Sequence, residues 1–330
     1  MIKLKGIYTI RDTRHPYYWD VVFEWEDELS RALDIPLIRV GEKYDKLYRS
    51  SISTRILNRL NFYQWKDRFL FNPSGYYIAF HIGPPGIYSF HSRKDVIPII
   101  IDFWKSENLK KFESIFSLNK FVFVTSKEVF NYLTSQKLKI NLAHLALSLP
   151  DKLMADYSNQ QRPFDLIQLG RQNEKLTAFT TRLLVDFPDI NYVHGQTIDG
   201  KLQMISSRHG TLGEFSSRES FITLLKKARI SLLSAPGLDA DSKRTGGFSP
   251  VTPRFLESAA CGCKLIGIYP ENDDFVHYGI NNICANVKTY EEFQSLVLNY
   301  LKDPTIPDYR EFLLTHLTTQ RATQLLAAIS

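Results

Sequence analysis

The sequence predicts an α/β protein built from two doubly wound, Rossmann-like domains. Apolar strand-like segments alternate with amphipathic helix-like segments along the whole chain, a pattern typical of parallel sheets covered by helices. The alternation begins again after a polar stretch at residues 156–163. A length of 330 residues, with 44% hydrophobic and 23% charged residues, also suits two globular domains of ordinary size.

The first domain is expected over residues 1–155. Its strands are short runs rich in Ile, Val, Phe and Tyr, and its helices carry apolar residues three or four positions apart. Ser126 stands where a strand turns into a helix, so we expect it to cap that helix. The predicted strands are residues 3–10, 75–83, 96–103, 120–126 and 140–150, and the predicted helices are 19–35 and 126–136.

The second domain is expected over residues 156–307, and a helix over residues 308–330 ends the chain. The polar composition and the single proline of residues 156–163 mark the linker between the domains. Within the second domain the predicted strands are residues 164–170, 190–195, 229–237 and 263–270, and the predicted helices are 174–187, 218–228 and 289–303.

Several classes of protein are excluded by composition and motif. No run approaches the roughly 20 apolar residues of a membrane-spanning helix, and the first residues lack a secretory apolar region, so a cytoplasmic protein is expected. The three cysteines, Cys261, Cys263 and Cys284, show neither zinc nor disulfide spacing. No GxGxxG follows a strand, and no Walker loop is present, which argues against dehydrogenases and NTPases.

Positive charge is concentrated in the first half. Residues 1–150 hold 22 Lys and Arg against 15 Asp and Glu, whereas residues 151–330 hold 19 against 20. The excess indicates an anionic membrane surface, a phosphorylated acceptor or nucleic acid, or else solvated lysines. No nucleic-acid-reading motif is present, so no nucleic-acid partner is expected. Residues 51–72 interleave basic with aromatic side chains and predict either contact with anionic lipid or packing on the core.

The most informative motif is TPRFLESAACGCKLIG, residues 252–267. Thr252 and Pro253 are expected to be the N-cap and the first residue of a helix. Arg254 in the first turn then opposes the helix dipole, a conflict that disappears if Arg254 and the helix N-terminus hold an anion such as a diphosphate. Glu257 is expected to accept hydrogen bonds from ribose or sugar hydroxyls. The alternative is an ordinary surface pair of Arg254 and Glu257.

This motif resembles the donor-binding motif of GT-B glycosyltransferases of the group 1 type, where a glutamate heads a helix before a strand. The stretch FDLIQLGRQNEK, residues 164–175, is similar to the opening of that family's nucleotide-sugar domain. Residues 209–235 resemble its glycine-containing loop, helix and strand beside the nucleobase, and residues 121–133 and 145–151 resemble parts of its first domain. Ser249 stands about where many retaining members carry a second glutamate, so the sequence is closer to short-motif relatives with a single donor-site glutamate.

The resemblance implies two domains facing a cleft, a final helix that crosses back to the first domain, and a nucleotide-diphosphate sugar as donor. It implies no metal and no cofactor, because fixed cations and N–H groups stabilise the departing diphosphate. The implied donor-binding residues are Gly170, Arg171, Lys175, Gly213, Ser249, Thr252, Arg254 and Glu257. A general base is expected from the first domain, where Asp102, His81 and Asp12 stand at or near strand ends.

The function implied is a glycosyltransferase of undetermined stereochemistry. Its acceptor would be a glycan, a lipid-linked molecule or another glycoconjugate in bacterial-type surface polysaccharide synthesis, with the enzyme in the cytoplasm or peripheral on the inner face of the membrane. Two alternatives stay open. One is a non-catalytic module of the same fold that binds a sugar or nucleotide, and the other is a metal-dependent transferase that uses the DxD of Asp239–Asp241.

Overall fold

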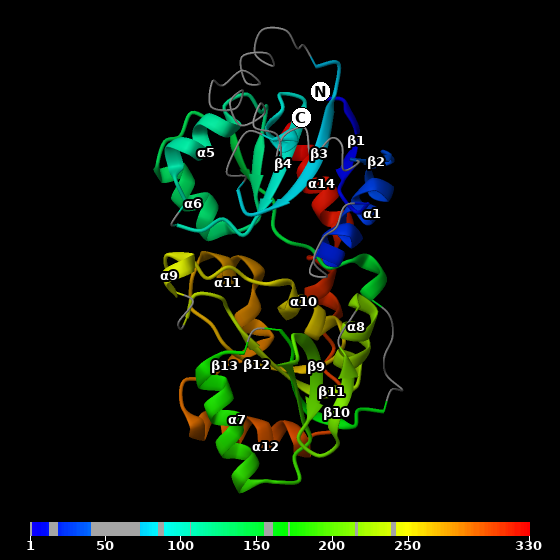
Figure 1. Cartoon of the computed structure of the whole chain (residues 1–330), viewed down its shortest axis with the longest axis vertical. Coiled ribbons are helices and arrows are strands. Elements are labelled where there is room, and N and C mark those ends of the chain that lie inside the picture. Colours follow the sequence, from blue (N-terminus) through cyan, green and yellow to red (C-terminus); the bar gives the residue numbers. More distant parts are fainter. Residues whose placement is uncertain are drawn as a thin grey trace. The chain divides into compact units, whose positions relative to one another are not determined.

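A computed structural model describes most of the chain, which forms two compact α/β units (Figure 1). Unit 1 holds Met1–Ser148 together with Thr318–Ser330, and unit 2 holds Leu149–Leu317. The predicted α/β class with two doubly wound sheets is confirmed by the topology of each unit. The described residues are 2–12, 19–40, 73–84, 89–105, 107–154, 161–170, 172–214, 217–238 and 242–330.

Unit 1 is built on a six-stranded parallel sheet with the order β2-β1-β3-β4-β5-β6. The central strand β4 is buried along its whole length, as a continuous apolar run in a parallel sheet should be. The short strand β2 was not expected from the sequence. The strands are Leu4–Thr9 (β1), Leu37–Arg39 (β2), Tyr76–Ile82 (β3), Val96–Ile101 (β4), Val122–Val124 (β5) and Leu142–His144 (β6).

The helices of unit 1 begin where the sequence places capping residues. The Ser126 hydroxyl accepts from the N–H of Val129 at 3.1 Å, which confirms the predicted cap. Helix α14 lies beside α1 (Figure 1), and its buried Arg321 donates from Nε to the carbonyl of Ala146 at 3.0 Å. The helices are Asp20–Leu33 (α1), Leu109–Phe116 (α5), Lys127–Ser135 (α6) and Thr318–Ile329 (α14).

The end of the chain differs from the single helix expected over residues 308–330. The structure has two helices there, Arg310–Leu314 (α13) and Thr318–Ile329 (α14), and only α14 belongs to unit 1. The chain leaves unit 1 after Ser148 and re-enters it at Thr318, where the two hydroxyls lie 3.0 Å apart. The compact units therefore divide at positions other than the expected 155 and 308.

Unit 2 is built on a seven-stranded sheet with the order β10-β9-β8-β7-β11-β12-β13. Five strands are parallel, and β9 and β10 add an antiparallel hairpin beside β8. The sequence predicts a loop around Gly213, but this residue lies in strand β10. The strands are Phe164–Gln168 (β7), Tyr192–Ile198 (β8), Lys201–Ser206 (β9), Gly210–Glu214 (β10), Ala228–Ser234 (β11), Lys264–Ile268 (β12) and Cys284–Asn286 (β13).

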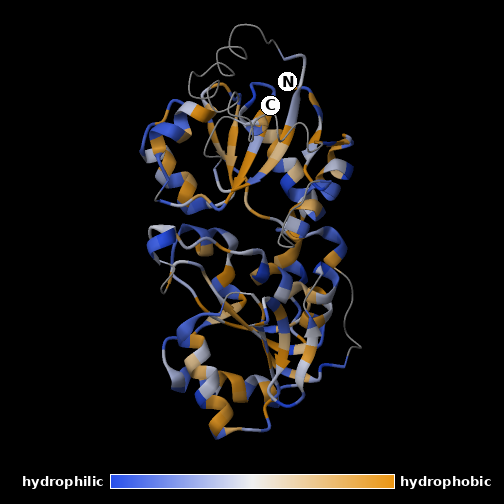
Figure 2. Ribbon diagram, in the orientation of Figure 1, coloured by the Kyte–Doolittle hydropathy of each residue, from blue (hydrophilic) through white to orange (hydrophobic). Residues whose placement is uncertain are grey.

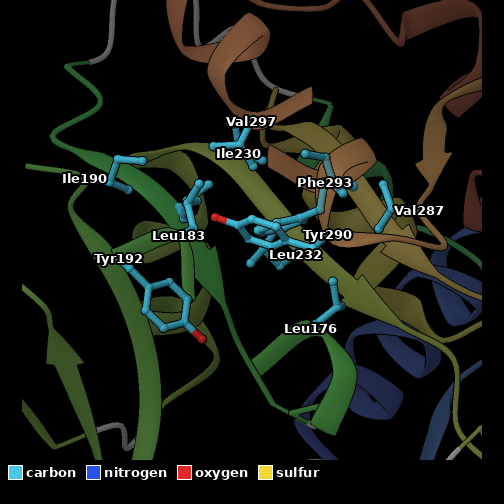
Figure 3. Close-up of a cluster of buried hydrophobic side chains, with 12 residues drawn as sticks. Leu176, Leu183, Ile190, Tyr192, Ile230, Leu232, Val287, Tyr290, Phe293 and Val297 are labelled. Atoms are coloured by element: carbon cyan, nitrogen blue, oxygen red, sulfur yellow. The ribbon is translucent and has the colours of Figure 1, made fainter. Parts of the chain in front are cut away.

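Helices cover both faces of this sheet. Leu176 and Leu183 of α7 pack with Phe293 and Val297 of α12 over strand residues such as Ile230, forming the core cluster of Figure 3. On the opposite face, Ser231 of β11 is hydrogen-bonded to Ser258 of α10 at 2.9 Å. The helices of unit 2 are Glu174–Asp186 (α7), Arg218–Lys226 (α8), Ser242–Thr245 (α9), Pro253–Ala260 (α10), Asp273–Tyr278 (α11), Tyr290–Lys302 (α12) and Arg310–Leu314 (α13).

Hydrophobic residues gather on the strands of both sheets, whereas the helices carry hydrophilic residues on their outer sides (Figure 2). This distribution is what the burial of the sheets requires, since the large fully buried side chains include Phe123 in unit 1 and Phe255 in unit 2. Among the described residues, no helix combines the length and the apolar character needed to cross a membrane.

Candidate functional site

The sheet of unit 2 has a topological switch point between β7 and β11. From β7 the chain passes through α7 to β8 on one side, whereas β11 lies on the other side of β7 and is followed by α10 and β12. Helices α7, α8 and α10 therefore all begin at the edge where the parallel strands end. Doubly wound sheets bind ligands at such a point. The side chains at this edge are the candidates for a ligand site.

Arg254, from the first turn of α10, reaches the end of β7. Its Nη1 donates to the carbonyl of Leu169 at 3.1 Å. Gly170 has a φ of +79°, and a Cβ added to it would lie 2.4 Å from the Nη1 of Arg254 and 2.7 Å from its Cζ. The backbone conformation favours glycine here, and a larger residue would have to displace the guanidinium of Arg254. The structure thus brings together two predicted donor-binding residues, Gly170 and Arg254.

The start of α10 has the features of an anion-binding helix N-terminus. Thr252 is the N-cap by position and Pro253 is the first helical residue, as the sequence predicts. In the described part of the chain, no side chain caps the helix, and the Thr252 Oγ1 is buried without a hydrogen-bond partner. Because the N-cap side chain supplies no acceptor to the first turn, this end of α10 suits a bound anion beside the Arg254 cation.

Glu257 lies one turn further along α10 and is 2% exposed. Its Oε1 is 2.6 Å from the Nη2 of Arg218, the first residue of α8, whose side chain is 16% exposed. The sequence predicts a Glu257 that accepts hydrogen bonds from ribose or sugar hydroxyls, with a surface pair of Arg254 and Glu257 as the alternative. The structure shows a buried carboxylate paired with an arginine from another helix, so the surface pair is wrong.

Sequence reasoning missed Arg218, although a signal for it is present. Ser217 caps α8 and accepts from the N–H of Ser220 at 3.1 Å, which places Arg218 in the first turn. A cation there opposes the helix dipole, the same conflict that draws attention to Arg254. Two helices at this edge of the sheet therefore begin with an arginine against local preference.

Lys175 is not joined to Arg254 by any contact that the structure records among the described residues. It is exposed at the start of α7, and its Nζ lies 5.7 Å from the centre of the Phe179 ring. Hydrogen bonds from the N–H groups of Lys288 and Thr289 lower the pKa of Glu292, and the charge of Lys175 contributes less. The recorded ring contact of Lys175 is therefore with its own helix.

Gly213 lies away from the switch point. It sits in the edge strand β10, which β9 and β8 separate from β7, and it has a φ of +123° at a β-bulge. No atom of the residues that the structure describes lies within 4 Å of a Cβ added to it.

Ser249 is 3% exposed, and its main-chain carbonyl accepts from the Nδ2 of Asn272 at 3.0 Å. A Cβ added to Gly237, just past β11, would lie 3.2 Å from the Ser249 hydroxyl. Ser249 therefore lies against the turn that follows β11, next to the switch point.

Some candidates lie outside the described residues. These are Arg171, the DxD of Asp239–Asp241 and the basic aromatic segment at 51–72.

In unit 1 the switch point lies between β1 and β3, and the three candidate bases occupy the same edge of the sheet. Asp12 follows β1, His81 is near the end of β3, and Asp102 directly follows β4. Asp12 is exposed and accepts from the Nη1 of Arg39 at 2.9 Å. Asp102 is exposed and has a φ of +58°, a conformation that costs a non-glycine residue about 1 kcal/mol or more.

His81 has a defined ring orientation. Its Nδ1 is hydrogen-bonded to the carbonyl of Gly83, and because a carbonyl only accepts, Nδ1 carries the proton. In a neutral ring, Nε2 is then the basic nitrogen. The ring meets that of the buried His91 edge to face, with centroids 4.3 Å apart.

Sequence reasoning also missed a buried acidic cluster at the end of β1. Glu26 of α1 is 1% exposed and lies 3.4 Å from the Nη2 of Arg11, which is also 2.9 Å from the Oδ1 of Asp27. Burial raises the pKa of Glu26 to about 7, although Thr9 and Arg11 oppose the shift.

No three His, Cys, Asp or Glu side chains of the described ranges are grouped so as to hold a metal ion.

No model of a protein family matches the sequence, and no curated protein matches it. Several solved structures are similar. The pneumococcal O-GlcNAc transferase GtfA, in complex with UDP and GlcNAc, has 11% identity and a TM-score of 0.48 over 81% of this chain and 58% of its own. The glycotransferase of kitacinnamycin has 11% identity and a TM-score of 0.42 over 100% of both chains.

A Listeria monocytogenes protein described as a UDP-N-acetylglucosamine 2-epimerase has 12% identity and a TM-score of 0.49 over 99% of this chain and 95% of its own. The chain spans 58% of the length of the pneumococcal transferase. With TM-scores below 0.5, these similarities do not indicate a reaction for this protein.

Proposed function

We propose that this protein is a GT-B glycosyltransferase that moves a sugar from a nucleotide-diphosphate sugar to a hydroxyl group of an acceptor. One observation carries the proposal: Arg254 lies against Gly170 at the switch point of unit 2, at the start of a helix that no described side chain caps. A cation, helix N–H groups and a glycine that permits close approach are what a diphosphate requires. The resemblance of residues 252–267 to a donor-binding motif supports the same ligand.

Arg254 would stabilise the leaving diphosphate. In glycosyl transfer, negative charge develops on the nucleoside diphosphate while the sugar takes on oxocarbenium character. Fixed donors aimed at that charge lower the barrier without a metal ion. We assign this role to Arg254 and the first turn of α10, with Arg171 and Lys175 as further candidates from the sequence.

Glu257 would bind the ribose through one oxygen of its carboxylate. Its Oε1 is engaged by Arg218 at 2.6 Å, so Oε2 is the oxygen that we assign to a ribose hydroxyl. Gly213 lies in β10, away from Arg254, and has no assigned role in this scheme.

His81 is our candidate for the general base that accepts the proton of the acceptor hydroxyl. The hydrogen bond to Gly83 holds the ring and leaves Nε2 as the basic nitrogen, the arrangement seen in many catalytic histidines. Asp102 is the second candidate, because strained backbone conformations cluster at functional sites. Asp12 is weaker, since its carboxylate is paired with Arg39.

The acceptor would be a glycan or a lipid-linked molecule of bacterial-type surface polysaccharide synthesis. The excess of basic residues in the first half of the chain supports a cytoplasmic enzyme that contacts an anionic membrane from the inner face.

A ligand screen tests the proposal. The melting temperature would be measured with UDP, GDP, ADP, CMP and dTDP, with Mg²⁺ or with EDTA. A ligand at about a hundred times its Kd adds roughly 2.7 kcal/mol of stability, which raises the melting temperature clearly. We expect one diphosphate to stabilise the protein equally in EDTA, and the effect to be lost in Arg254→Ala but kept in Arg182→Ala, which removes an exposed arginine of α7.

The alternatives give different results in the same screen. Stabilisation that needs Mg²⁺ and disappears in EDTA would favour a metal-dependent transferase that uses Asp239–Asp241. Stabilisation without turnover of the matching nucleotide sugar, with glycan and lipid acceptors supplied, would favour a binding module. Conversion of the nucleotide sugar to its epimer, without transfer, would overturn the transferase assignment.

A further inference from the structure

We propose that Arg218 is a positioning residue of the donor site. It fixes the Glu257 carboxylate and cancels its charge, so that this carboxylate does not counteract Arg254 and the start of α10 when they bind the donor diphosphate. This inference rests on the proposed function, because the diphosphate is the ligand that it concerns.

The geometry ties Arg218 to Glu257. The Nη2 of Arg218 lies 2.6 Å from the Oε1 of Glu257, and the side chains are 16% and 3% exposed. A charge-assisted contact this short and this buried is little screened by solvent or salt. Arg218 is therefore a fixed part of the environment of Glu257.

The charges explain why such a partner is needed. Arg254 and Glu257 are three residues apart on α10, so they are neighbours on the same side of the helix. An uncompensated carboxylate there would oppose Arg254 and repel a dianionic or trianionic ligand, strongly so in a site of low dielectric constant. With Arg218 paired to Glu257, the three side chains together carry a net charge of about +1.

The placement of Arg218 supports a role at the ligand rather than in the core. It lies in the first turn of α8 at the same edge of the sheet where Arg254 lies in the first turn of α10, and in both cases the cation opposes the helix dipole. Local conflicts of this kind concentrate at functional sites. The ion pair of Arg229 and Asp165, with atoms 3.5 Å apart, lies instead at the amino ends of β11 and β7, at the opposite edge of the same sheet.

Affinity for inorganic pyrophosphate, measured by calorimetry, tests the inference, with the nucleoside diphosphate found in the ligand screen as a second probe. We expect Arg218→Met to weaken pyrophosphate binding at least tenfold, because the Glu257 charge is then unopposed. Arg218→Lys should retain most of the affinity. The matched control Arg229→Met, which breaks an ion pair away from the site, should lower the melting temperature and leave the affinity unchanged.

A second variant separates positioning from structural support. In Arg218→Met combined with Glu257→Gln, the repelling carboxylate is gone, so pyrophosphate affinity should return to within about threefold of that of Glu257→Gln alone. If Arg218 only supported the fold, pyrophosphate affinity would follow the melting temperature of each variant and not the presence of the Glu257 charge. The double variant also avoids a buried unpaired charge, so it keeps the test decisive if Arg218→Met does not fold.

The outcomes that overturn the inference differ from those that overturn the proposed function. Equal pyrophosphate affinity in the wild-type protein and Arg218→Met overturns the inference alone. Loss in Arg218→Met without rescue by Glu257→Gln also overturns it. If the wild-type protein binds neither pyrophosphate nor any nucleoside diphosphate, the proposed function is overturned, and this inference with it.

Discussion

The guanidinium of Arg254 lies directly against Gly170. The carbonyl of Leu169 accepts from the Nη1 of Arg254 at 3.1 Å, and a Cβ on Gly170 would come within 2.4 Å of the same nitrogen. The contact joins the first turn of α10 to the end of β7, at the switch point of the sheet of unit 2. Because it places a cation at the start of a helix whose N-cap side chain makes no capping hydrogen bond, it is the part of the molecule on which the proposed donor site depends.

Gly170→Ala is expected to displace Arg254 and weaken binding of the nucleoside diphosphate at least tenfold. The positive φ of 79° should also cost about 1–2 kcal/mol of unfolding free energy. Gly200→Ala is the matched control, because Gly200 has a φ of +76° but nothing within 4 Å of its Cβ position. Urea unfolding and calorimetry of both variants check this. Equal ligand affinity in the two variants would contradict a role for the Arg254 contact.

Arg254→Ala is expected to leave the fold intact and to lower kcat/KM for the donor by about 2–4 kcal/mol of transition-state stabilisation. Arg254→Lys should recover only part of this, because an ammonium lacks the planar fork that reaches both Leu169 and a phosphate. Arg182→Ala, which removes an arginine whose side chain is 61% exposed, serves as the control. Unchanged donor kinetics in Arg254→Ala, with a native circular dichroism spectrum, would remove the main support for the proposed function.

Glu26→Gln is expected to change how stability depends on pH. Burial raises the pKa of Glu26 from 4.5 to about 7, so between these pH values the folded state binds a proton that the unfolded state has released. The contribution of this carboxyl to the free energy of unfolding is therefore fully present below about pH 4.5. It is lost as the pH rises through 7, which lowers the free energy of unfolding by on the order of 3 kcal/mol.

Urea midpoints of the wild-type protein and Glu26→Gln between pH 5 and 8 measure this change. The difference between the two proteins should shift in favour of the variant as pH rises. Parallel curves would show that Glu26 does not change its protonation in this range. Glu292→Gln provides a contrast, because hydrogen bonds from two main-chain N–H groups lower the pKa of Glu292, so its contribution is lost as pH falls.

His81→Gln is expected to lower kcat by a factor of about 10² to 10⁴ while leaving the Kd of the nucleoside diphosphate unchanged, if His81 is the general base. Asp102→Asn, tested in parallel, should have a much smaller effect. Rate measurements from pH 5 to 9 should show activity falling below the pKa of one basic group, and this limb should disappear in His81→Gln. The reverse ranking of the two variants would move the assignment to Asp102.

Much of the fold was predictable because its signals are local. β4 is a continuous apolar run and β7 a strand that ends before a glycine, so both are recognisable within a few residues. Ser126 caps its helix as predicted, and Thr252 with Pro253 begins α10 as predicted. The β9–β10 hairpin was missed, because its five-residue strand β10 is exposed throughout and lacks an apolar pattern.

The α/β class, the two doubly wound units and the position of Arg254 at a helix start follow from the periodicity and capping of short segments, so they can be read from the sequence. The tertiary structure brings Arg254 to Leu169, 85 residues earlier in the chain, and pairs Glu257 with Arg218. It likewise decided the burial of Glu26 against Arg11. These contacts depend on the order in which strands pair and on which face each helix crosses, and the free energy that selects that order is spread over the whole core.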